Sequence, residues 1–193
     1  MKQFASVIDK IIPLNLNNVD TDMIIPAEHL KSISQSGFGE FLFSGLRKLY
    51  PDFILNNPTF QKRKILISKA NFGSGSSREH AVWAIQQYGI EVVICSSFSD
   101  IFFNNSAKNG LLLISLPESL IEEFINNALN HPDEIIQINL KDQEIKYLSN
   151  TYHFDYDPYR KHCLLTGQDD LDFLLSQINE VEQYEKENCR ISW

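Results

Sequence analysis

The sequence lacks long apolar runs and closely spaced cysteines. No stretch of about 18 apolar residues occurs, so a membrane-spanning helix is excluded. Cys95, Cys163 and Cys189 lie far apart and form no Cys-x-x-Cys motif. This spacing argues against a disulfide framework, a self-contained zinc site and a complete set of iron–sulfur ligands. If the protein uses a metal, we expect another chain to hold it.

Basic residues are also scarce. Seventeen Lys and Arg stand against 25 Asp and Glu, which gives the 193-residue chain a formal charge of -8. Because such a surface repels phosphate backbones and anionic membranes, we expect neither nucleic acid nor a membrane as a partner. The stretch from Met1 to Asp9 reaches a charge before an apolar core of signal-peptide length develops. We therefore expect a protein of the reducing cytoplasm.

The middle of the chain alternates between short β-branched runs and amphipathic stretches. From Ile65 to Leu116 the order is strand, loop, helix, strand, helix and strand, which predicts a largely parallel sheet with helices packed on it. The first of these helices is expected over residues 78–88, with one buried stripe and with Gly89 as its C-cap. Another helix is expected over residues 119–129.

The remaining segments have other patterns. Residues 135–140 and 144–148 are typical of an antiparallel hairpin. The first 60 residues, whose apolar runs are broken by Asn, Asp, Pro and Gly, predict strands and ordered loops over one edge of the domain. Residues 169–188 are acidic and predict a solvated helix. Because no repeat or low-complexity linker occurs, we expect residues 1–193 to form a single domain.

One loop between a predicted strand and a predicted helix carries the most chemical information. Two glycines, Gly73 and Gly75, let its backbone turn sharply, and Ser76 or Ser77 can cap the helix and leave its first N–H groups free for an anion. Arg78 adds a permanent charge whose planar guanidinium fits a carboxylate through two hydrogen bonds. The full segment reads Ala70-Asn71-Phe72-Gly73-Ser74-Gly75-Ser76-Ser77-Arg78-Glu79-His80-Ala81.

The same loop has a purely structural interpretation, in which the glycines give loop geometry, the serines cap a helix, and Arg78 and Glu79 form a surface pair. Three known motifs do not fit it. A P-loop requires a Lys after its last Gly, and an α/β-hydrolase elbow requires Gly-x-Ser-x-Gly. The dinucleotide-binding fingerprint requires a third glycine where this chain has Ser76 to Arg78.

The loop resembles the signature Asn-Phe-Gly-x-Gly-Ser-Ser-Arg-Glu-His-Ala of the 3-isopropylmalate dehydratase small subunits. A shorter form, Gly-Ser-Ser-Arg-Glu, marks the swivel domain of aconitases. Residues 18–26 are similar to the family segment Val-Asp-Thr-Asp-x-Ile-Ile-Pro, and residues 97–102 and 109–112 to Ser-Phe-x-Asp-Ile-Phe and Asn-Gly-Leu-Leu. The resemblance implies an α/β fold: a swivelling β/β/α domain like domain 4 of aconitase, with a mostly parallel βαβ core and an antiparallel, barrel-like sheet.

The resemblance also implies an activity. The family consists of hydro-lyase subunits that interconvert 2- and 3-isopropylmalate through isopropylmaleate in leucine biosynthesis. It implies a heterodimer with a large subunit that holds a [4Fe–4S] cluster, a small dicarboxylate substrate, and no metal or cofactor on this chain. Two alternatives stay open: the small subunit of a related hydro-lyase acting on citraconate, homoaconitate or a dimethylmalate, and an anion-binding module without chemistry of its own.

By the same resemblance, Ser76 is the catalytic base, and Ser77, Arg78, Gly75 and Ser74 bind the substrate. A serine hydroxyl is a very weak acid, so its alkoxide requires stabilisation by the Arg78 charge and by the amides at the helix N-terminus. Thr21 and Asp22 then orient the Ser76 loop, although any Asp-rich turn can also simply cap a helix.

Three further residues are weaker candidates. His80 lies one helical turn after Ser76 and can face the substrate, although a lone His early in a helix is more often a packing residue. Lys31 and Arg47 fall where the family places a substrate-recognition loop, and both are equally compatible with ordinary surface positions. The chain departs from the family pattern at four positions: Ser74 replaces a Cys, Leu46 replaces a Trp, and Ser32 and Gln35 replace basic residues. We expect Cys95 to be a core residue.

Overall fold

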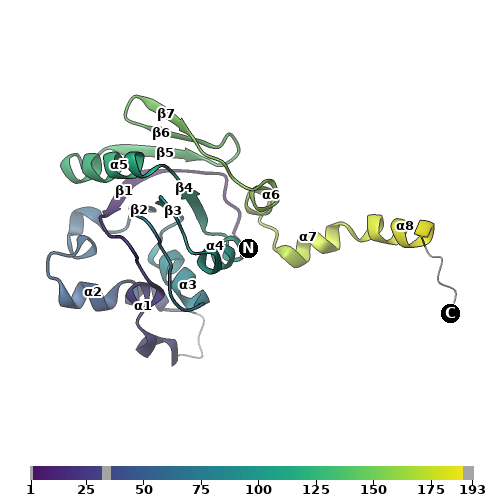
Figure 1. The fold of residues 1–193 in the computed structure, drawn as a ribbon, viewed down its shortest axis with the longest axis horizontal. Helices are drawn as coiled ribbons and strands as arrows, with labels where there is room; N and C mark the ends of the chain where they lie inside the picture. Colours follow the sequence, from purple (N-terminus) through teal and green to yellow (C-terminus); the bar gives the residue numbers. More distant parts are fainter. Residues whose placement is uncertain (1, 32–35, 189–193) are drawn as a thin grey trace.

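The computed structural model describes residues 2–31 and 36–188, and within these ranges a seven-stranded sheet has the order β4-β3-β2-β1-β5-β6-β7 (Figure 1). Neighbours among β1 to β4 pair in parallel, and β5, β6 and β7 extend the sheet in antiparallel from β1. The strands are β1 (Ser6–Leu14), β2 (Ile65–Ser68), β3 (Val92–Cys95), β4 (Leu112–Ser115), β5 (Ile135–Asn139), β6 (Glu144–Tyr147) and β7 (Asn150–His153). The expected α/β class, with a parallel core and an antiparallel extension, is confirmed.

The predicted alternation of strands and helices is confirmed from β2 to β4. Helices α3 (Glu79–Tyr88) and α4 (Asp100–Asn109) connect the parallel strands, and α5 (Glu118–Asn130) follows β4. The C-cap of α3 is Gly89, whose φ of 110° lies in the left-handed region. The hairpin of β5 and β6 is also as predicted. Strand β7 was not predicted, because its four residues are polar and lack an alternating apolar pattern.

The prediction for the first 60 residues is wrong in two respects. Strand β1 lies in the middle of the sheet, between β2 and β5, and not at an edge of the domain. Within the described ranges, the rest of this segment contains short helices joined by the expected ordered loops, and no second strand. The helices are α1 (Thr21–Ile24), η1 (Ala27–Lys31), η2 (Phe38–Phe41), α2 (Ser44–Leu49), η3 (Ile54–Asn56) and η4 (Pro58–Phe60).

Both faces of the parallel strands are covered by apolar side chains. Successive residues of a strand point to opposite faces, so Ile12 and Leu66 pack on the side of α3 and α4, whereas Ile11 and Ile65 pack on the side of α5. A sheet that is buried on both faces has continuous apolar strands. This explains why β2, β3 and most of β4 contain no outward-facing polar position, and why Cys95 is fully buried as predicted.

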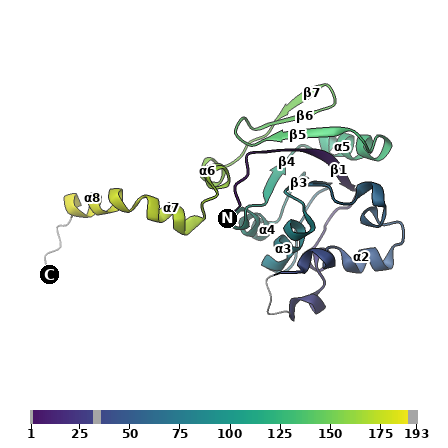
Figure 2. The same cartoon turned by 180° about the vertical axis from the view of Figure 1, so that it is seen from behind.

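The chain ends in helices that leave the body of the protein. Helix α6 (Pro158–Thr166) packs through the buried residues Cys163 and Leu164, whereas α7 (Asp170–Ser176) and α8 (Ile178–Asn188) extend away from the sheet (Figures 1 and 2). The single helix predicted over residues 169–188 is therefore divided at Gln177. The break has no Gly or Pro to mark it. None of the helices in the described ranges is long and apolar enough to cross a bilayer.

The substitution Phe124→Ala tests the core between α5 and the antiparallel strands. Phe124 is fully buried and meets the rings of Tyr147 and Tyr152 edge to face, at centroid distances of 4.9 and 5.1 Å. The cavity left by the ring is expected to lower the free energy of unfolding by about 3–5 kcal/mol, measured by urea denaturation. The exposed Leu171 of α7 is the control, and Leu171→Ala is expected to change that free energy by less than about 0.5 kcal/mol.

Candidate functional site

The Gly-Ser loop lies at the carboxyl ends of three neighbouring parallel strands. It follows β2, and isolated β-bridges join it to the turn after β1, through Asp20 and Ser74, and to the turn after β3, through Phe72 and Phe98. Ligands of parallel α/β sheets commonly bind beyond the carboxyl ends of the strands. The fold therefore places the loop where a binding site is expected.

The turn after β1 holds one side of the loop through its backbone. The Gly73 N–H donates to the Val19 carbonyl at 2.7 Å, and the Thr21 N–H donates to the Ser74 carbonyl at 2.9 Å. The Thr21 hydroxyl, on a residue that is 2% exposed, donates to the Ser76 carbonyl at 3.0 Å. Thr21 is thus bonded directly to the candidate catalytic residue.

The turn after β3 holds the other side. The Phe72 N–H donates to the Ser97 carbonyl and the Ser99 N–H donates to the Phe72 carbonyl, both at 3.0 Å. The Ser99 hydroxyl donates to the Gly73 carbonyl at 2.5 Å. Gly73, with a φ of 77°, also lies so close to the Phe102 ring that a Cβ atom would come within 2.2 Å of it. The carbonyls on this stretch of the loop are therefore directed into the protein.

Most of the amide N–H groups that follow in the loop are not hydrogen-bonded to the protein. The Ser74 N–H faces the Val19 carbonyl across the bridge between Asp20 and Ser74. The N–H groups of residues 75–78 donate to no acceptor in the described part of the chain, nor do the hydroxyls of Ser76 and Ser77 have a partner there. Both serines are exposed. The predicted serine cap is wrong: the N-cap of α3 is Arg78, without a side-chain hydrogen bond, and the Ser76 carbonyl is bonded to Thr21 instead. The free amides give the loop a positive partial charge that can attract an anion.

Arg78 forms an ion pair with Asp22. Its guanidinium donates through Nη1 and Nη2 to the two carboxylate oxygens of Asp22, the second bond being 2.9 Å long. The Arg78 side chain is 15% exposed and that of Asp22 is 57% exposed. The alternative surface pair of Arg78 with Glu79 is not seen, because Glu79 accepts from the Asn109 amide at 2.8 Å. The two expected supporting residues, Thr21 and Asp22, are thus both in contact with the loop.

The structure gives His80 and Arg47 contacts outside the loop. His80 packs against the rings of Phe38 and Trp83, at centroid distances of 5.2 and 4.8 Å, which is the arrangement of a packing residue. Arg47 lies near Tyr88, where its charge opposes the rise that burial causes in the tyrosine pKa. Tyr88 ends α3 and Ser76 precedes it, so the length of that helix, about 15 Å, separates the two regions. The side chain of Lys31, and residues 32 and 35, lie outside the described part of the chain.

The cysteines do not form a ligand set. Burial raises the pKa of the Cys95 thiol well above its usual value, and Cys163 is buried in α6. Cys189 lies outside the described residues. Among the residues that the structure describes, no group of three His, Cys, Asp or Glu side chains is arranged to hold a metal ion. These residues do not fit an iron–sulfur cluster.

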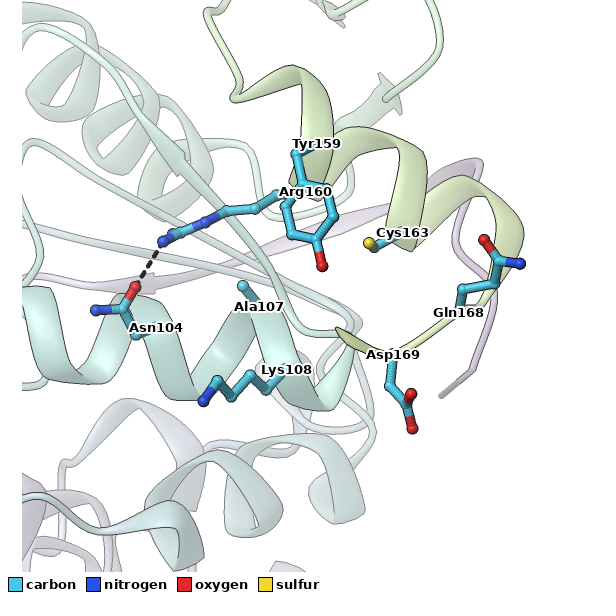
Figure 3. A pocket seen from close by; sticks show the side chains of 8 residues that line it. All are labelled: Asn104, Ala107, Lys108, Tyr159, Arg160, Cys163, Gln168 and Asp169. Carbon is cyan, nitrogen blue, oxygen red and sulfur yellow. Dashed lines mark hydrogen bonds between the residues drawn. The ribbon is translucent and has the colours of Figure 1, made fainter. Parts of the chain in front are cut away.

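A cavity of about 200 Å³ lies between α4 and α6 and shares no residue with the loop (Figure 3). The Arg160 guanidinium beside it is already engaged, because it donates to Asn104 Oδ1 at 2.5 Å and lies 4.7 Å from the centre of the Phe103 ring. We assign this cavity no role in the site. It is lined by Asn104, Ala107, Lys108, Tyr159, Arg160, Cys163, Gln168 and Asp169.

Sequence reasoning missed several residues that hold the loop. Val19, Ser97, Ser99 and Phe102 all contact it, yet none was a candidate. A sequence signal for Ser97, Ser99 and Phe102 was present, because residues 97–102 belong to one of the segments that resemble the dehydratase family. Only the pairing of neighbouring strands shows that this segment reaches the Gly-Ser loop.

Comparisons with known proteins agree on one family. Residues 1–119 match the Aconitase C-terminal domain family. The chain is 46% identical over 186 residues to the 3-isopropylmalate dehydratase small subunit of Francisella philomiragia, covering 96% of this chain and 98% of that protein. It is 43% identical to the protein of the same name from Paramagnetospirillum magneticum, covering 96% of each.

A solved structure gives the same result for the fold. The crystal structure of 3-isopropylmalate dehydratase (leuD) from Methanocaldococcus jannaschii superimposes with a TM-score of 0.64 at 25% identity, covering 94% of this chain and 99% of that one. The expected fold, a swivelling β/β/α domain of the aconitase type, is confirmed by this match and by the family match.

Gly73→Ala tests the contact between the loop and Phe102. An alanine there is expected to cost about 2–4 kcal/mol of unfolding free energy, since a left-handed φ and an overlap with the ring both oppose it. Gly37→Ala is the matched control, because Gly37 also has a left-handed φ, 92°, but its added Cβ would meet nothing within 4 Å. Chemical denaturation of both variants measures the difference, and equal losses would contradict the assigned contact.

Proposed function

This chain belongs to the family of 3-isopropylmalate dehydratase small subunits, which are hydro-lyase subunits with an aconitase-type domain, and we propose that its Ser76 loop forms one wall of their active site. The reaction is the interconversion of 2- and 3-isopropylmalate by removal and return of water, through isopropylmaleate, in leucine biosynthesis.

One observation supports this proposal most strongly. The carbonyls of residues 72, 73, 74 and 76 are bonded to the protein, whereas the N–H groups of residues 75–78 are free in the described part of the chain. Free consecutive amides beside an arginine form a site for a carboxylate. A dicarboxylate substrate presents this group, and the site attracts it locally although the whole chain carries a charge of -8.

Ser77, Arg78, Gly75 and Ser74 are proposed to bind one substrate carboxylate. Gly75 and Ser77 contribute their backbone N–H groups, Ser77 also has an exposed hydroxyl, and Ser74 contributes its side-chain hydroxyl. Arg78 already binds Asp22 through Nη1 and Nη2, so the remaining N–H groups of its guanidinium are available to the substrate. Asp22 and Thr21 are proposed to fix the guanidinium and the Ser76 carbonyl before the substrate arrives.

Ser76 is proposed to remove the proton beside a substrate carboxylate and to return it on hydration. Its hydroxyl is exposed and unpartnered in the described part of the chain, so it can reach a bound molecule. The alkoxide form is accessible only where positive charge surrounds it, and the loop amides and Arg78 supply that charge. The residues of this chain account for the proton and the carboxylate, but not for the hydroxide that leaves.

We propose that a large subunit completes the site as the partner in a heterodimer, and that it holds the [4Fe–4S] cluster that the resemblance implies. The exposed loop and the separated, buried Cys95 and Cys163 support a division of the active site between two chains. We also propose that residues 1–193 act as one domain, since α6 joins the core under α5 through Leu164. The two unpaired, buried thiols are compatible with a reducing cytoplasm.

Ser76→Ala tests the proton transfer. In the enzyme co-expressed with its large subunit, removal of the hydroxyl is expected to lower kcat by about 10²–10⁴-fold, because a general base is lost. Formation of isopropylmaleate, followed by ultraviolet absorbance, measures the rate, and size-exclusion chromatography is expected to show unchanged association with the large subunit.

The control for this variant is Ser119→Ala, on the exposed face of α5, which is expected to leave kcat unchanged. A Ser76→Ala enzyme within threefold of the wild-type kcat would overturn the role of Ser76. A wild-type enzyme that hydrates citraconate but does not turn over isopropylmalate would instead overturn the assigned substrate.

Arg78→Lys tests carboxylate binding. Lysine keeps the charge but cannot bind Asp22 and a substrate carboxylate with planar, paired N–H groups. KM is therefore expected to rise about 10–100-fold, which corresponds to the free energy of one hydrogen bond to a charged group. Steady-state kinetics measure KM and kcat. Asp22→Asn is the matched control, because it weakens the ion pair and leaves the guanidinium in place. If Asp22→Asn raises KM as much as Arg78→Lys, the effect belongs to the ion pair and not to a substrate contact.

A further inference from the structure

We propose that α7 and α8 form an arm that docks onto the large subunit, in a groove that has an apolar floor and Lys or Arg at its border. This inference rests on the proposed function in one respect, which is that the large subunit is the partner. The contact it describes is separate from the Ser76 loop.

The two helices expose large apolar side chains along one side. In α7 these residues have the spacing i, i+3 and i+4, and in α8 they recur at every third position, so each set lies on one side of its helix. Each is between 49% and 67% exposed, and contiguous exposed apolar surface of this kind is typical of an interaction site. The set, named here the apolar stripe, consists of Leu171, Leu174, Leu175, Ile178, Val181 and Tyr184.

The body of the protein does not cover the apolar stripe. Helix α7 contacts the body through Phe173, which lies on another side of the helix. The Phe173 ring meets that of Tyr159 edge to face at a centroid distance of 4.7 Å and lies 6.1 Å from that of His162. Beyond this contact both helices extend away from the sheet (Figures 1 and 2). Burial of the stripe therefore requires another molecule.

Carboxylates beside the stripe indicate the chemistry of that molecule. Residues 169–188 contain seven Asp and Glu and a single Lys. Glu182 and Glu185 follow Ile178 and Val181 by four positions each, so they lie next to the stripe. Both are exposed, and neither forms an ion pair in the described part of the chain. A surface that buries the stripe meets these carboxylates, and Lys or Arg at its border would complement them.

Charge favours the large subunit over a second copy of this chain. Two copies joined through the stripe would bring two acidic segments together, and each whole chain carries a charge of -8. A large subunit is the partner that the name of the relatives implies. The Francisella philomiragia protein covers 96% of this chain, which is too much for residues 170–188 to lie outside the length that the two proteins share. The arm is therefore not an addition peculiar to this chain.

The arm begins at the opposite end of α4 from the Gly-Ser loop. Asp169, the N-cap of α7, and Lys108, in the last turn of α4, line the same cavity (Figure 3). The loop meets α4 at its first turn, through Ser99 and Phe102. The length of α4, about 15 Å, separates the two places. Substitutions in the stripe are therefore expected to change the affinity for the large subunit and to leave the chemistry at the loop intact.

The test compares two double variants in which alanine keeps the helices intact. Leu174→Ala with Ile178→Ala shortens two side chains of the stripe. Asn179→Ala with Gln183→Ala is the matched control, because it changes two exposed polar residues on another side of α8. Biolayer interferometry with the purified large subunit measures Kd, which is expected to rise about 10–100-fold in the stripe variant and less than about threefold in the control.

Two further measurements separate docking from other roles. Glu182→Gln with Glu185→Gln is expected to raise Kd about 3–10-fold at low salt and to have little effect at high salt, because salt screens surface charge pairs. With the large subunit in saturating excess, the kcat of every variant is expected to equal that of the wild type.

Equal Kd values for the wild type and the stripe variant would overturn the proposal. A loss of unfolding free energy in the isolated stripe variant would do so as well, since the stripe would then pack on its own chain. A wild-type dimer in sedimentation that the stripe variant abolishes would assign the stripe to a second copy, and an unchanged low-salt Kd in the glutamine variant would overturn the basic border.

The binding measurement also distinguishes this proposal from the proposed function. A wild-type chain that does not bind the large subunit would overturn both the arm and the partnership. A complex that forms but does not turn over isopropylmalate would overturn the proposed reaction alone, and the Kd values of the variants would still decide the role of the arm.

Discussion

The site depends on hydrogen bonds that reach the Gly-Ser loop from two sides. The turn after β1 bonds it through Val19 and Thr21, and the turn after β3 bonds it through Ser97 and Ser99. These turns meet the loop because β1, β2 and β3 are parallel neighbours whose carboxyl ends lie together. These bonds engage the loop carbonyls as far as Ser76 and leave the N–H groups of residues 75–78 free in the described part of the chain, which supports the proposed anion site.

The packed sheet below the loop fixes the positions of these turns. Residues of β1 to β4 point alternately into a core under α3 and α4 and a core under α5, and both cores are fully buried. A shift of any parallel strand by one residue would exchange the two sets of side chains. Strand β1 also joins the parallel and antiparallel halves, so its placement decides where the Thr21 turn meets the loop. The residues proposed to bind a ligand lie in loops, but their positions are set by strands in the core.

The sequence predicts those elements whose local pattern and tertiary environment agree. Strands β2 to β4 are apolar runs in a buried sheet, and Gly89 ends α3 in the left-handed conformation that favours glycine. It does not predict the central place of β1, since pairing between distant segments leaves no local pattern. The catalytic candidates could be named from a motif. Ser99 could not, because it approaches the loop from a neighbouring strand and the pairing of strands leaves no local pattern. Arg47 lies near Tyr88 at the far end of α3, a position that no pattern in its neighbourhood indicates.

Arg78 adds little net positive charge to the site in the isolated chain. Asp22 neutralises Arg78 through paired hydrogen bonds, so we expect the amides of residues 75–78 to carry most of the attraction for an anion in the isolated chain. Amide dipoles act over a short range, and exposed ones compete with water. Their effect grows when water is excluded and the local dielectric constant falls. We therefore expect the exposed Ser76 loop to become a strong site only when another surface covers it, and for a chain of this family that surface is expected to be the large subunit.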